Sequence, residues 1–401
     1  PAPLTSNYDR LVAHPTNPDI VYVGGDAWVS ATIYKSSDGG RNWATTVRTA
    51  SPTNISRGWL SMWGPAVKCL TMSPLDPERL YFGTSGAVFK TDNGGDTWQQ
   101  IHSQTLANGT IKGNGLEVTC LHSITAHPRV PDRLYFGYYD IGLMISRDAG
   151  ATFERGVEGV TPREFRNSLF CIAFDTTDDE HCWGSFGTWG SNHGGLAESH
   201  DGGRTWVMLP TTDTGLPRTR HRQLFADRTQ AGSTRLVCSA DEKGVFGSHD
   251  AGKTWRSLNA GLPHGNIRGL TRHPSSPDTF LCALNTAKDG AGGVFRSDDA
   301  CVTWHQASRN LEAGDMKALV LAESAPDRVY LANRTRNVGN GKTVPGGLFR
   351  SDGGGKTWRH VLDDDFVQGV AVDPRDADVV YVGLTDHPYH DQCLGEGILM
   401  T

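Results

Sequence analysis

Polar side chains recur at equivalent positions along this chain, each where a predicted strand ends. These rim positions are Asp26, Ser85, Tyr139, Gly187, Asp241, Asn285, Arg334 and Thr385, and Asp140 directly follows one of them. Acids, a tyrosine and an arginine that converge on one mouth are typical of a sugar-binding site. Two carboxylates, with Asp26 and Asp241 as the first candidates, could then act as acid and base in glycoside hydrolysis.

A second type of reaction is an alternative at the same rim positions. A tyrosine or histidine beside an arginine could abstract a proton next to a uronate carboxylate and neutralise that carboxylate. His193, His221 and Arg222 are the candidates for this chemistry, and Tyr139 and Asp140 are further catalytic candidates at the rim. The alternative at each of these positions is a polar residue that only hydrates the mouth of a channel.

Aromatic residues in the predicted loops favour a carbohydrate ligand. Trp28, Trp59, Trp63 and Trp189 lie in long loops, and exposed tryptophans beside carboxylates suit stacking on sugar rings. Arg334 and Asn285 are the polar candidates for substrate binding. The alternative for each tryptophan is that it packs its own loop.

The run DHPYHDQC at 386–393 is the densest group of potential metal ligands. His387, His390 and Asp391 could hold a divalent metal, since imidazole and carboxylate are suitable donors. No cofactor is otherwise expected to be required.

A repeated phrase of the form S-x-D-x-G-x-T-W, here called the box, indicates how these residues are positioned. Asp and Gly in the phrase suit a tight turn, and the closing aromatic residue opens the next strand. Copies recur every 49–55 residues and close on Trp43, Trp98, Phe153, Trp206, Trp255, Trp304 and Trp358. Asn93 and Gly353 replace the Asp in two copies, and Cys301 replaces a Gly in a third.

Each unit between boxes reads as four short strands joined by turns, which is one antiparallel sheet. Such sheets repeated around an axis form an all-β propeller. Eight units begin near Leu11, Val67, Val118, Leu169, Arg222, Ile267, Met316 and Val367, so we expect eight blades, with seven as the alternative. Residues 1–401 then form a single propeller domain.

The last unit looks incomplete. Its final phrase GILMT ends at Thr401, which matches the first position of a box that is not present. We expect either that the native chain continues or that a second polypeptide completes this blade. The oligomeric state is left open.

The connections on the two faces of the predicted ring differ. The turns between first and second strands are short, as are the boxes, whereas the connections on the other face vary greatly in length. Variable loops on a rigid scaffold carry function, so we place the site on this face. The long connections include residues 48–66, 187–198, 333–347 and 385–397.

The boxes resemble the Asp-box, or BNR, repeats of sialidases, xyloglucan-degrading glycoside hydrolases and sortilin-type receptor propellers. The resemblance implies an extracellular carbohydrate-active enzyme, secreted or periplasmic, that cleaves a polysaccharide or oligosaccharide as a hydrolase or a lyase. The alternative is a non-catalytic propeller that binds a protein or glycan. A net charge of −6 spread along the chain gives no nucleic-acid patch, and no stretch is long enough to span a membrane.

Overall fold

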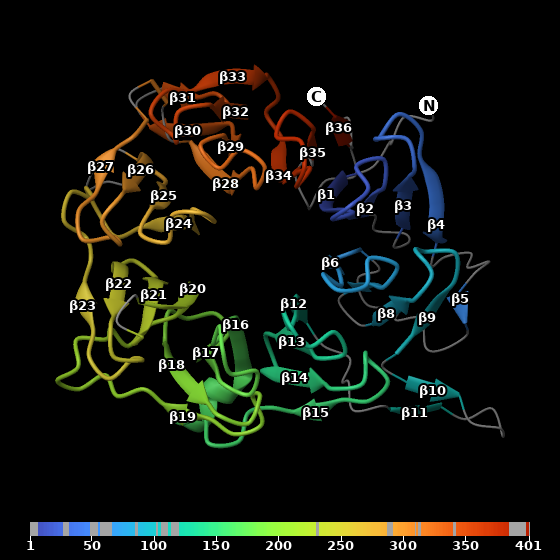
Figure 1. Cartoon of the computed structure of the whole chain (residues 1–401), viewed down its shortest axis with the longest axis horizontal. Coiled ribbons are helices and arrows are strands. Elements are labelled where there is room, and N and C mark those ends of the chain that lie inside the picture. Colours follow the sequence, from blue (N-terminus) through green and yellow to red (C-terminus); the bar gives the residue numbers. More distant parts are fainter. Residues whose placement is uncertain are drawn as a thin grey trace.

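The computed structural model describes residues 7–26, 32–48, 55–56, 66–84, 87–101, 103–105, 111–113, 120–229, 232–286, 292–308, 310–311, 314–339, 342–384 and 398–400. These residues form small antiparallel sheets arranged in a ring (Figure 1). The first strands of successive sheets contact one another around the centre. The only helix in the described part of the chain is the 3-10 turn η1 (Arg163–Asn167).

The four main strands of each of the first four blades pair in chain order. Blade one holds β1 (Asn7–Ala13), β2 (Val21–Asp26), β3 (Thr32–Ser36) and β4 (Ala44–Arg48). Blade two holds β6 (Cys69–Met72), β7 (Leu80–Gly83), β8 (Val88–Thr91) and β9 (Trp98–Gln100), with the short strand β5 (Ile55–Ser56) added parallel to β9. Blade three holds β12 (Leu121–Ala126), β13 (Leu134–Tyr138), β14 (Leu143–Ser146) and β15 (Glu154–Arg155), and blade four holds β16 (Ser168–Phe174), β17 (Cys182–Gly187), β18 (Gly194–Ser199) and β19 (Val207–Met208).

The remaining blades keep the same order. Blade five holds β20 (His221–Arg228), β21 (Thr234–Ala240), β22 (Gly244–Ser248) and β23 (Arg256–Ser257), and blade six holds β24 (Ile267–Arg272), β25 (Phe280–Leu284), β26 (Gly293–Ser297) and β27 (His305–Gln306). Blade seven holds β28 (Asp315–Leu321), β29 (Val329–Arg334), β32 (Gly347–Ser351) and β33 (Arg359–Leu362). Two hairpins lie in connections: β10 (Ser103–Thr105) with β11 (Ile111–Gly113), and β30 (Arg336–Gly339) with β31 (Lys342–Val344).

The described residues thus form seven blades of four or more strands, the number given as the alternative. They also form a three-stranded sheet of β34 (Val367–Val372), β35 (Val380–Leu384) and β36 (Ile398–Met400), at the place of the incomplete last unit. This sheet closes the ring against blade one, because Tyr381 packs with Tyr8, Val21 and Val23. The Tyr381 hydroxyl also donates to the carbonyl oxygen of Pro18 at 3.2 Å. The predicted propeller of four-stranded blades is confirmed.

Each box is a turn held by its own side chains. In blade four, the Ser199 hydroxyl donates to Asp201 Oδ1 at 2.8 Å, and Asp201 Oδ1 accepts from the Thr205 amide at 2.9 Å. Gly202 and Gly203 both have positive φ, 66° and 89°, a conformation that glycine adopts without a steric penalty. The Trp206 indole donates to Gly203 and Gly156, so this box also ties its blade to the connection from the preceding blade.

Side-chain-to-backbone hydrogen bonds also stabilise the turns between the first and second strands of several blades. His127 Nδ1 accepts hydrogen bonds from the amides of Arg129 and Val130 at 3.2 and 3.0 Å. His14 makes equivalent bonds in blade one. Asp175 in blade four and Asp373 in the three-stranded sheet fill the same role, each through Oδ1. A side chain that accepts from local amides is the usual way to satisfy backbone donors in a tight turn.

Most of the described cysteines pack as small buried hydrophobic residues. Cys69, Cys182, Cys238, Cys282 and Cys301 are buried free thiols. Cys171 and Cys182, which lie on the two strands of one hairpin, are both free thiols. Among the described residues, no helix has the length and hydrophobicity that crossing a membrane requires.

Candidate functional site

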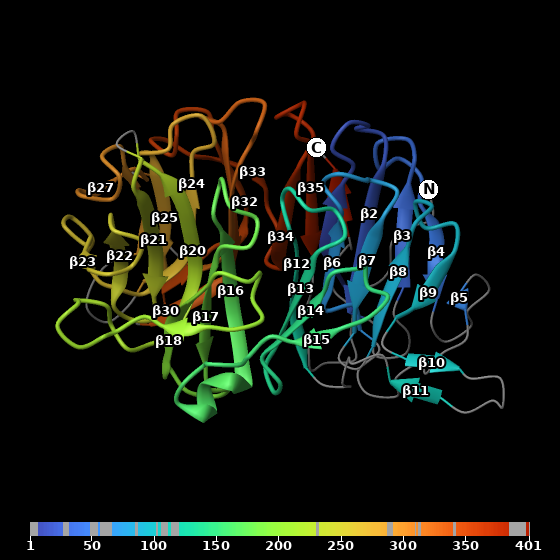
Figure 2. The same cartoon turned by 60° about the horizontal axis from the view of Figure 1, so that its bottom comes forward.

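An open pocket of about 1000 Å³ lies between blades three and four. It is on the face of the variable loops, where Figure 2 shows η1 and the β10–β11 hairpin at the same end of the ring. Its walls come from the loop after β13, the loop after β17 and the connection 155–167 that joins the two blades. The lining residues are Asp140, Arg155, Val157, Glu158, Arg163, Glu164, Arg166, Asn167, Thr188 and Trp189.

Asn167 holds the walls of this pocket together. Its side-chain nitrogen donates to the carbonyl oxygen of Asp140 at 3.2 Å, and its side-chain oxygen accepts from the Trp189 amide at 3.1 Å. Its backbone oxygen accepts from the Gly142 amide at 2.8 Å. Three segments that are distant in sequence are therefore fixed by one residue.

The connection that carries Asn167 is shaped by packing. Phe165 in η1 is 3% exposed and belongs to the core between blades three and four. The Arg218 guanidinium lies over its ring, 5.5 Å from the centroid. With Phe165 turned inward, Arg163 and Glu164 are exposed and line the pocket.

Charges of both signs line the pocket. Arg155 Nε donates to the Ile141 carbonyl at 3.0 Å, and Arg166 Nε donates to the Val160 carbonyl at 2.8 Å. Arg166 also lies 3.9 Å from Glu158, whose side chain is 74% exposed. Asp140 and Glu164 are exposed as well. Three carboxylates therefore line the pocket beside guanidinium groups that are anchored on backbone oxygens.

Trp189 and His193 lie together in the loop after β17. The Trp189 side chain is 67% exposed, which is unusual for an indole and suits stacking on a ligand. His193 is exposed, and its amide donates to the Ser191 hydroxyl at 3.2 Å. Trp189 lines the pocket, and His193 stands at the other end of the same short turn.

A polar network around Asp241 crosses from blade four to blade five. Asp241 Oδ1 accepts from Arg222 at 2.7 Å, and Oδ2 accepts from Arg220 at 2.9 Å. Arg220 also lies over the Phe170 ring, and Tyr139 packs against that ring from blade three. The structure therefore joins three predicted site residues, Tyr139, Asp241 and Arg222, through Arg220 and Phe170.

The position of His221 corrects its predicted catalytic role. His221 is fully buried, and neither ring nitrogen has a hydrogen-bond partner among the described residues. Burial lowers the pKa of His221 to about 3, which keeps the imidazole neutral. The strand register shifts between His221 and Gln223, and the neighbouring Arg222 is exposed where His221 is buried. His221 cannot contact a polysaccharide.

Asn285 is likewise a structural residue. It is 1% exposed, and its side-chain oxygen accepts from the Met316 amide at 2.8 Å, which ties blade six to blade seven. The predicted contact of Asn285 with substrate is therefore wrong. Arg334 is half-buried, with its guanidinium over the Phe366 ring at 5.8 Å, and it belongs to blade seven, away from the pocket between blades three and four.

Several candidates lie outside the described residues. These are Trp28, Trp59 and Trp63, the metal candidates His387, His390 and Asp391, and the rim positions Ser85 and Thr385. Asp26 ends β2, where its backbone pairs with Asn7, but its side chain is also outside the description. The pairing of Asp26 with Asp241 as acid and base stays a prediction.

The pocket residues Asn167, Glu158 and Glu164 were missed at the level of sequence. The stretch GVEGVTPREFRN at 156–167 could have indicated them, because it is a charged connection between a box and the next strand, on the face of the variable loops. The site was sought in the longest connections, and this connection was passed over because its length is ordinary.

No family model matches the chain. It is similar to a xyloglucanase from a Paenibacillus species, with 28% identity over 225 residues, covering 49% of this chain and 21% of that protein. It is also similar to an oligoxyloglucan-reducing end-specific xyloglucanase from Emericella nidulans, with 25% identity over 214 residues, covering 50% of this chain and 23% of that protein. The chain thus matches only about a fifth of the length of each relative.

Solved structures show the same architecture at lower identity. The GH74 xyloglucanase from Xanthomonas campestris matches with a TM-score of 0.50 and 16% identity, over 94% of this chain and 64% of that chain. Sqt1 from Saccharomyces cerevisiae matches with a TM-score of 0.61 and 13% identity, over 99% of this chain and 96% of that chain. These likenesses show the propeller fold, and the sequence relatives are xyloglucanases of low identity.

Proposed function

We propose that this propeller is a glycoside hydrolase that acts on a xyloglucan-like polysaccharide. The observation that carries the proposal is the pocket between blades three and four, which combines the exposed Trp189 with the carboxylates of Asp140, Glu158 and Glu164. An indole face and several carboxylates in one open groove are what binding and cleavage of a sugar chain require. The sequence relatives, both xyloglucanases, support the choice of substrate.

The role proposed for each residue follows from the side of the pocket on which it lies. Trp189 stacks on a sugar ring and places the neighbouring glycosidic bond between Asp140 on one wall and Glu158 or Glu164 on the other. One carboxyl group protonates the leaving oxygen, and the other acts as base or nucleophile. Arg155 and Arg166, anchored on backbone carbonyls, donate hydrogen bonds to sugar hydroxyls. No cofactor enters this scheme.

A uronate-directed lyase is the second candidate, because Arg155, Arg163 and Arg166 line the pocket and could neutralise a uronate carboxylate. The hydrolase fits better, since the histidine proposed as the base beside Arg222 is buried. A propeller that only binds a glycan or protein is the third. A polysaccharide substrate would place the protein outside the cytoplasm, secreted or periplasmic, and this location is part of the proposal.

One screen separates these candidates. The protein is incubated with xyloglucan, other plant polysaccharides and polyuronates, and both reducing ends and the absorbance of unsaturated uronates are read. Reducing ends from xyloglucan without new absorbance are expected. Unsaturated products would assign a lyase, and retention on immobilised xyloglucan without any cleavage would assign a binding protein. An absence of both cleavage and retention would refute a carbohydrate function.

A further inference from the structure

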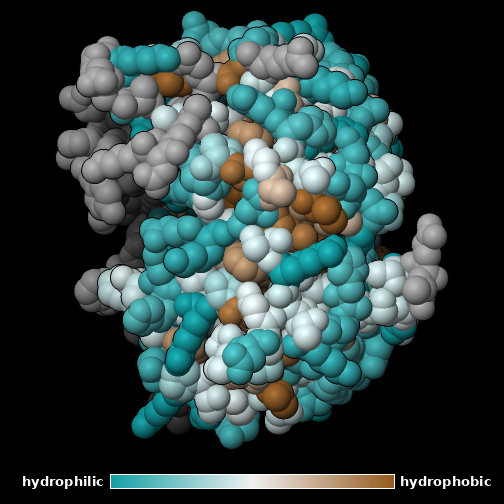
Figure 3. All heavy atoms as spheres, turned by 90° about the vertical axis from the view of Figure 1, so that its left-hand side faces the viewer, coloured by the Kyte–Doolittle hydropathy of each residue, from teal (hydrophilic) through white to brown (hydrophobic). Residues whose placement is uncertain are grey.

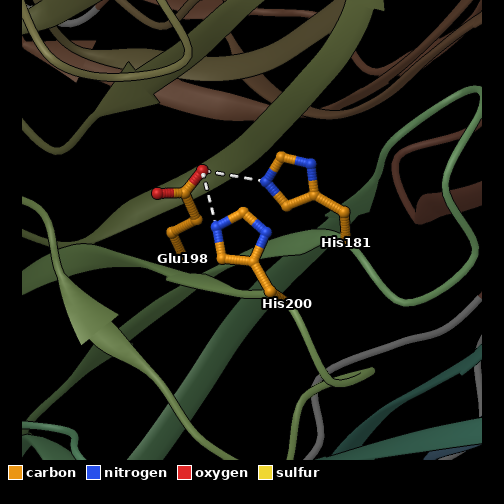
Figure 4. Close-up of side chains that lie close together, drawn as sticks. All are labelled: His181, Glu198 and His200. Carbon is orange, nitrogen blue, oxygen red and sulfur yellow. Dashed lines mark hydrogen bonds and ion pairs between the residues drawn. The ribbon is translucent and has the colours of Figure 1, made fainter.

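Three side chains with nitrogen or oxygen donors converge at the edge of blade four, on the face opposite the pocket. Here called the His181 cluster, they are His181, Glu198 and His200, and their ligand atoms all lie within 4.8 Å of one another. Glu198 Oε1 is 2.8 Å from His181 Nε2 and 3.7 Å from His200 Nε2. Figure 4 shows both imidazoles turned toward this one carboxylate.

A second carboxylate orients His181 from behind. Asp175 is 2% exposed, and its Oδ2 lies 3.3 Å from His181 Nδ1. Its Oδ1 is occupied by the Thr177 amide and hydroxyl, both at 2.8 Å. A carboxylate oxygen accepts hydrogen bonds, so Asp175 fixes the orientation of the ring from the Nδ1 side while Nε2 faces Glu198. A carboxylate behind the distal nitrogen is the usual support of a metal-bound histidine.

The cluster is held rigidly. His181 and Glu198 are 12% and 23% exposed, whereas His200 is 68% exposed and reaches the group from the box turn. The His181 ring contacts the buried Trp183 on one side and stacks on His200 on the other, with centroids 4.1 and 4.2 Å apart. Two donors are thus fixed in position, and the third is free to adjust.

The repeat shows that this arrangement is particular to blade four. The position of His181, one residue before the partner of the box Ser or Thr, is an arginine in four other blades: Arg79, Arg133, Arg235 and Arg328. The position of Glu198 carries no other acid; its equivalents are Lys35, Lys90, Ile145, Gly247, Arg296, Arg350 and Met400. At these two positions most blades have an arginine or a lysine, whereas blade four has an imidazole and a carboxylate, which can bind a cation.

We propose that the His181 cluster binds a divalent transition metal, with Zn²⁺ as the best fit. Two imidazole nitrogens and one carboxylate oxygen, with a water as the fourth ligand, are a common zinc donor set. Around a tetrahedral zinc with bonds of about 2.0–2.1 Å, ligand atoms sit roughly 3.3 Å apart. The distances here bracket that value, so small side-chain rotations suffice. The metal joins the turn before β17 to β18 and the box turn.

The test compares Zn²⁺ binding by the chelator-treated protein and its variants. His200→Ala and Glu198→Gln remove ligands, and His200 is exposed enough that its loss should not unfold the protein. His249→Ala is the matched control, because His249 occupies the same box position in blade five beside Gly247. His387→Ala with His390→Ala tests the other candidate metal run. Binding is followed by calorimetry and by the thermal unfolding midpoint, which rises with ligand concentration when only the folded state binds.

The expected result is one zinc per chain, with affinity lowered at least tenfold by His200→Ala and by Glu198→Gln and unchanged in His249→Ala. Co²⁺ in place of zinc should give the visible absorption of a four-coordinate ion, and His200→Ala should lose it. No zinc binding by the wild type would overturn the proposal. So would binding that survives both ligand variants but is lost on substitution of His387 and His390. Cleavage of xyloglucan does not enter the test, so this result is independent of the proposed function.

Discussion

The side-chain oxygen of Asn167 accepts a hydrogen bond from the backbone N–H of Trp189 at 3.1 Å. The same side chain donates to the carbonyl of Asp140. The loop that carries the exposed indole and the loop that carries a candidate catalytic carboxylate are therefore fixed relative to each other by a residue of the connection between their blades.

Asn167→Ala should raise the KM for xyloglucan by about fivefold, because a net hydrogen bond contributes about 1 kcal/mol. Asn310→Ala is the matched control, since Asn310 bonds the backbone of Trp358 through both side-chain atoms away from the pocket. The control should lower stability in urea unfolding and leave KM unchanged. Equal KM values for wild type and Asn167→Ala would show that Asn167 has no positioning role.

Trp189→Ala should weaken substrate binding by roughly tenfold, the size of one aromatic stacking contact. Removing an indole that is 67% exposed should cost little folding stability. Val207→Ala is the control, because Val207 is 71% exposed on the outer strand of the same blade. Affinity electrophoresis in gels with xyloglucan measures the effect. Unchanged migration of the Trp189 variant would place the sugar elsewhere.

Asp140→Asn, Glu158→Gln and Glu164→Gln identify the reacting carboxylates. Two of the three should lower kcat by about a hundredfold or more, as loss of a general acid or base does. Glu323→Gln, on the opposite face, should have no effect. If all three pocket variants keep full activity, catalysis lies elsewhere, and Asp26 with Asp241 becomes the pair to test by substitution with Asn.

The repeat predicted the fold well because every box must form the same turn. Ala300 and Cys301 adopt φ values of 59° and 69° in place of two glycines, so the box holds its shape even where the sequence departs from it. The pocket could not be found in this way, because it depends on the burial of Phe165 in a connection that does not repeat. The burial of His221 could not be predicted from strand alternation either, because the strand register shifts between His221 and Gln223.

The side of the ring over blades five and six has few exposed hydrophobic residues. Figure 3 shows the side over blades five and six as largely hydrophilic, with hydrophobic residues in small scattered groups. Docking surfaces stand out when a contiguous apolar patch is exposed. The pocket and the His181 cluster lie on the two opposite faces of the ring.

Stability should fall as the pH drops from about 6.5 toward 4. Burial lowers the pKa of His127 to about 4, with Arg133 adding to the effect, so in this window the unfolded chain takes up a proton that the folded chain does not. The loss is up to about 1.4 kcal/mol per pH unit for this one group. His127→Asn should reduce the slope of unfolding free energy against pH, because its oxygen can accept the same amides without titrating. His305→Ala, at an exposed histidine, is the control and should leave the slope unchanged.

Gly353→Asp should stabilise the protein. Gly353 stands where the other boxes have Asp or Asn, so the bonds that Asp201 makes to Ser199 and Thr205 have no counterpart from this position. A Cβ at Gly353 would meet only the Lys356 side chain, at 3.9 Å, and its φ is not positive. The new carboxylate should therefore accept the Thr357 amide and add about 1 kcal/mol to the free energy of unfolding, partly by restricting the unfolded chain.

Gly354→Asp is the matched control, because its φ is 62° and a Cβ there collides with Arg296. This variant should be less stable than the wild type. Urea unfolding of both variants decides the matter, and a destabilised Gly353→Asp would show that the seventh box is closed by contacts that an aspartate disturbs.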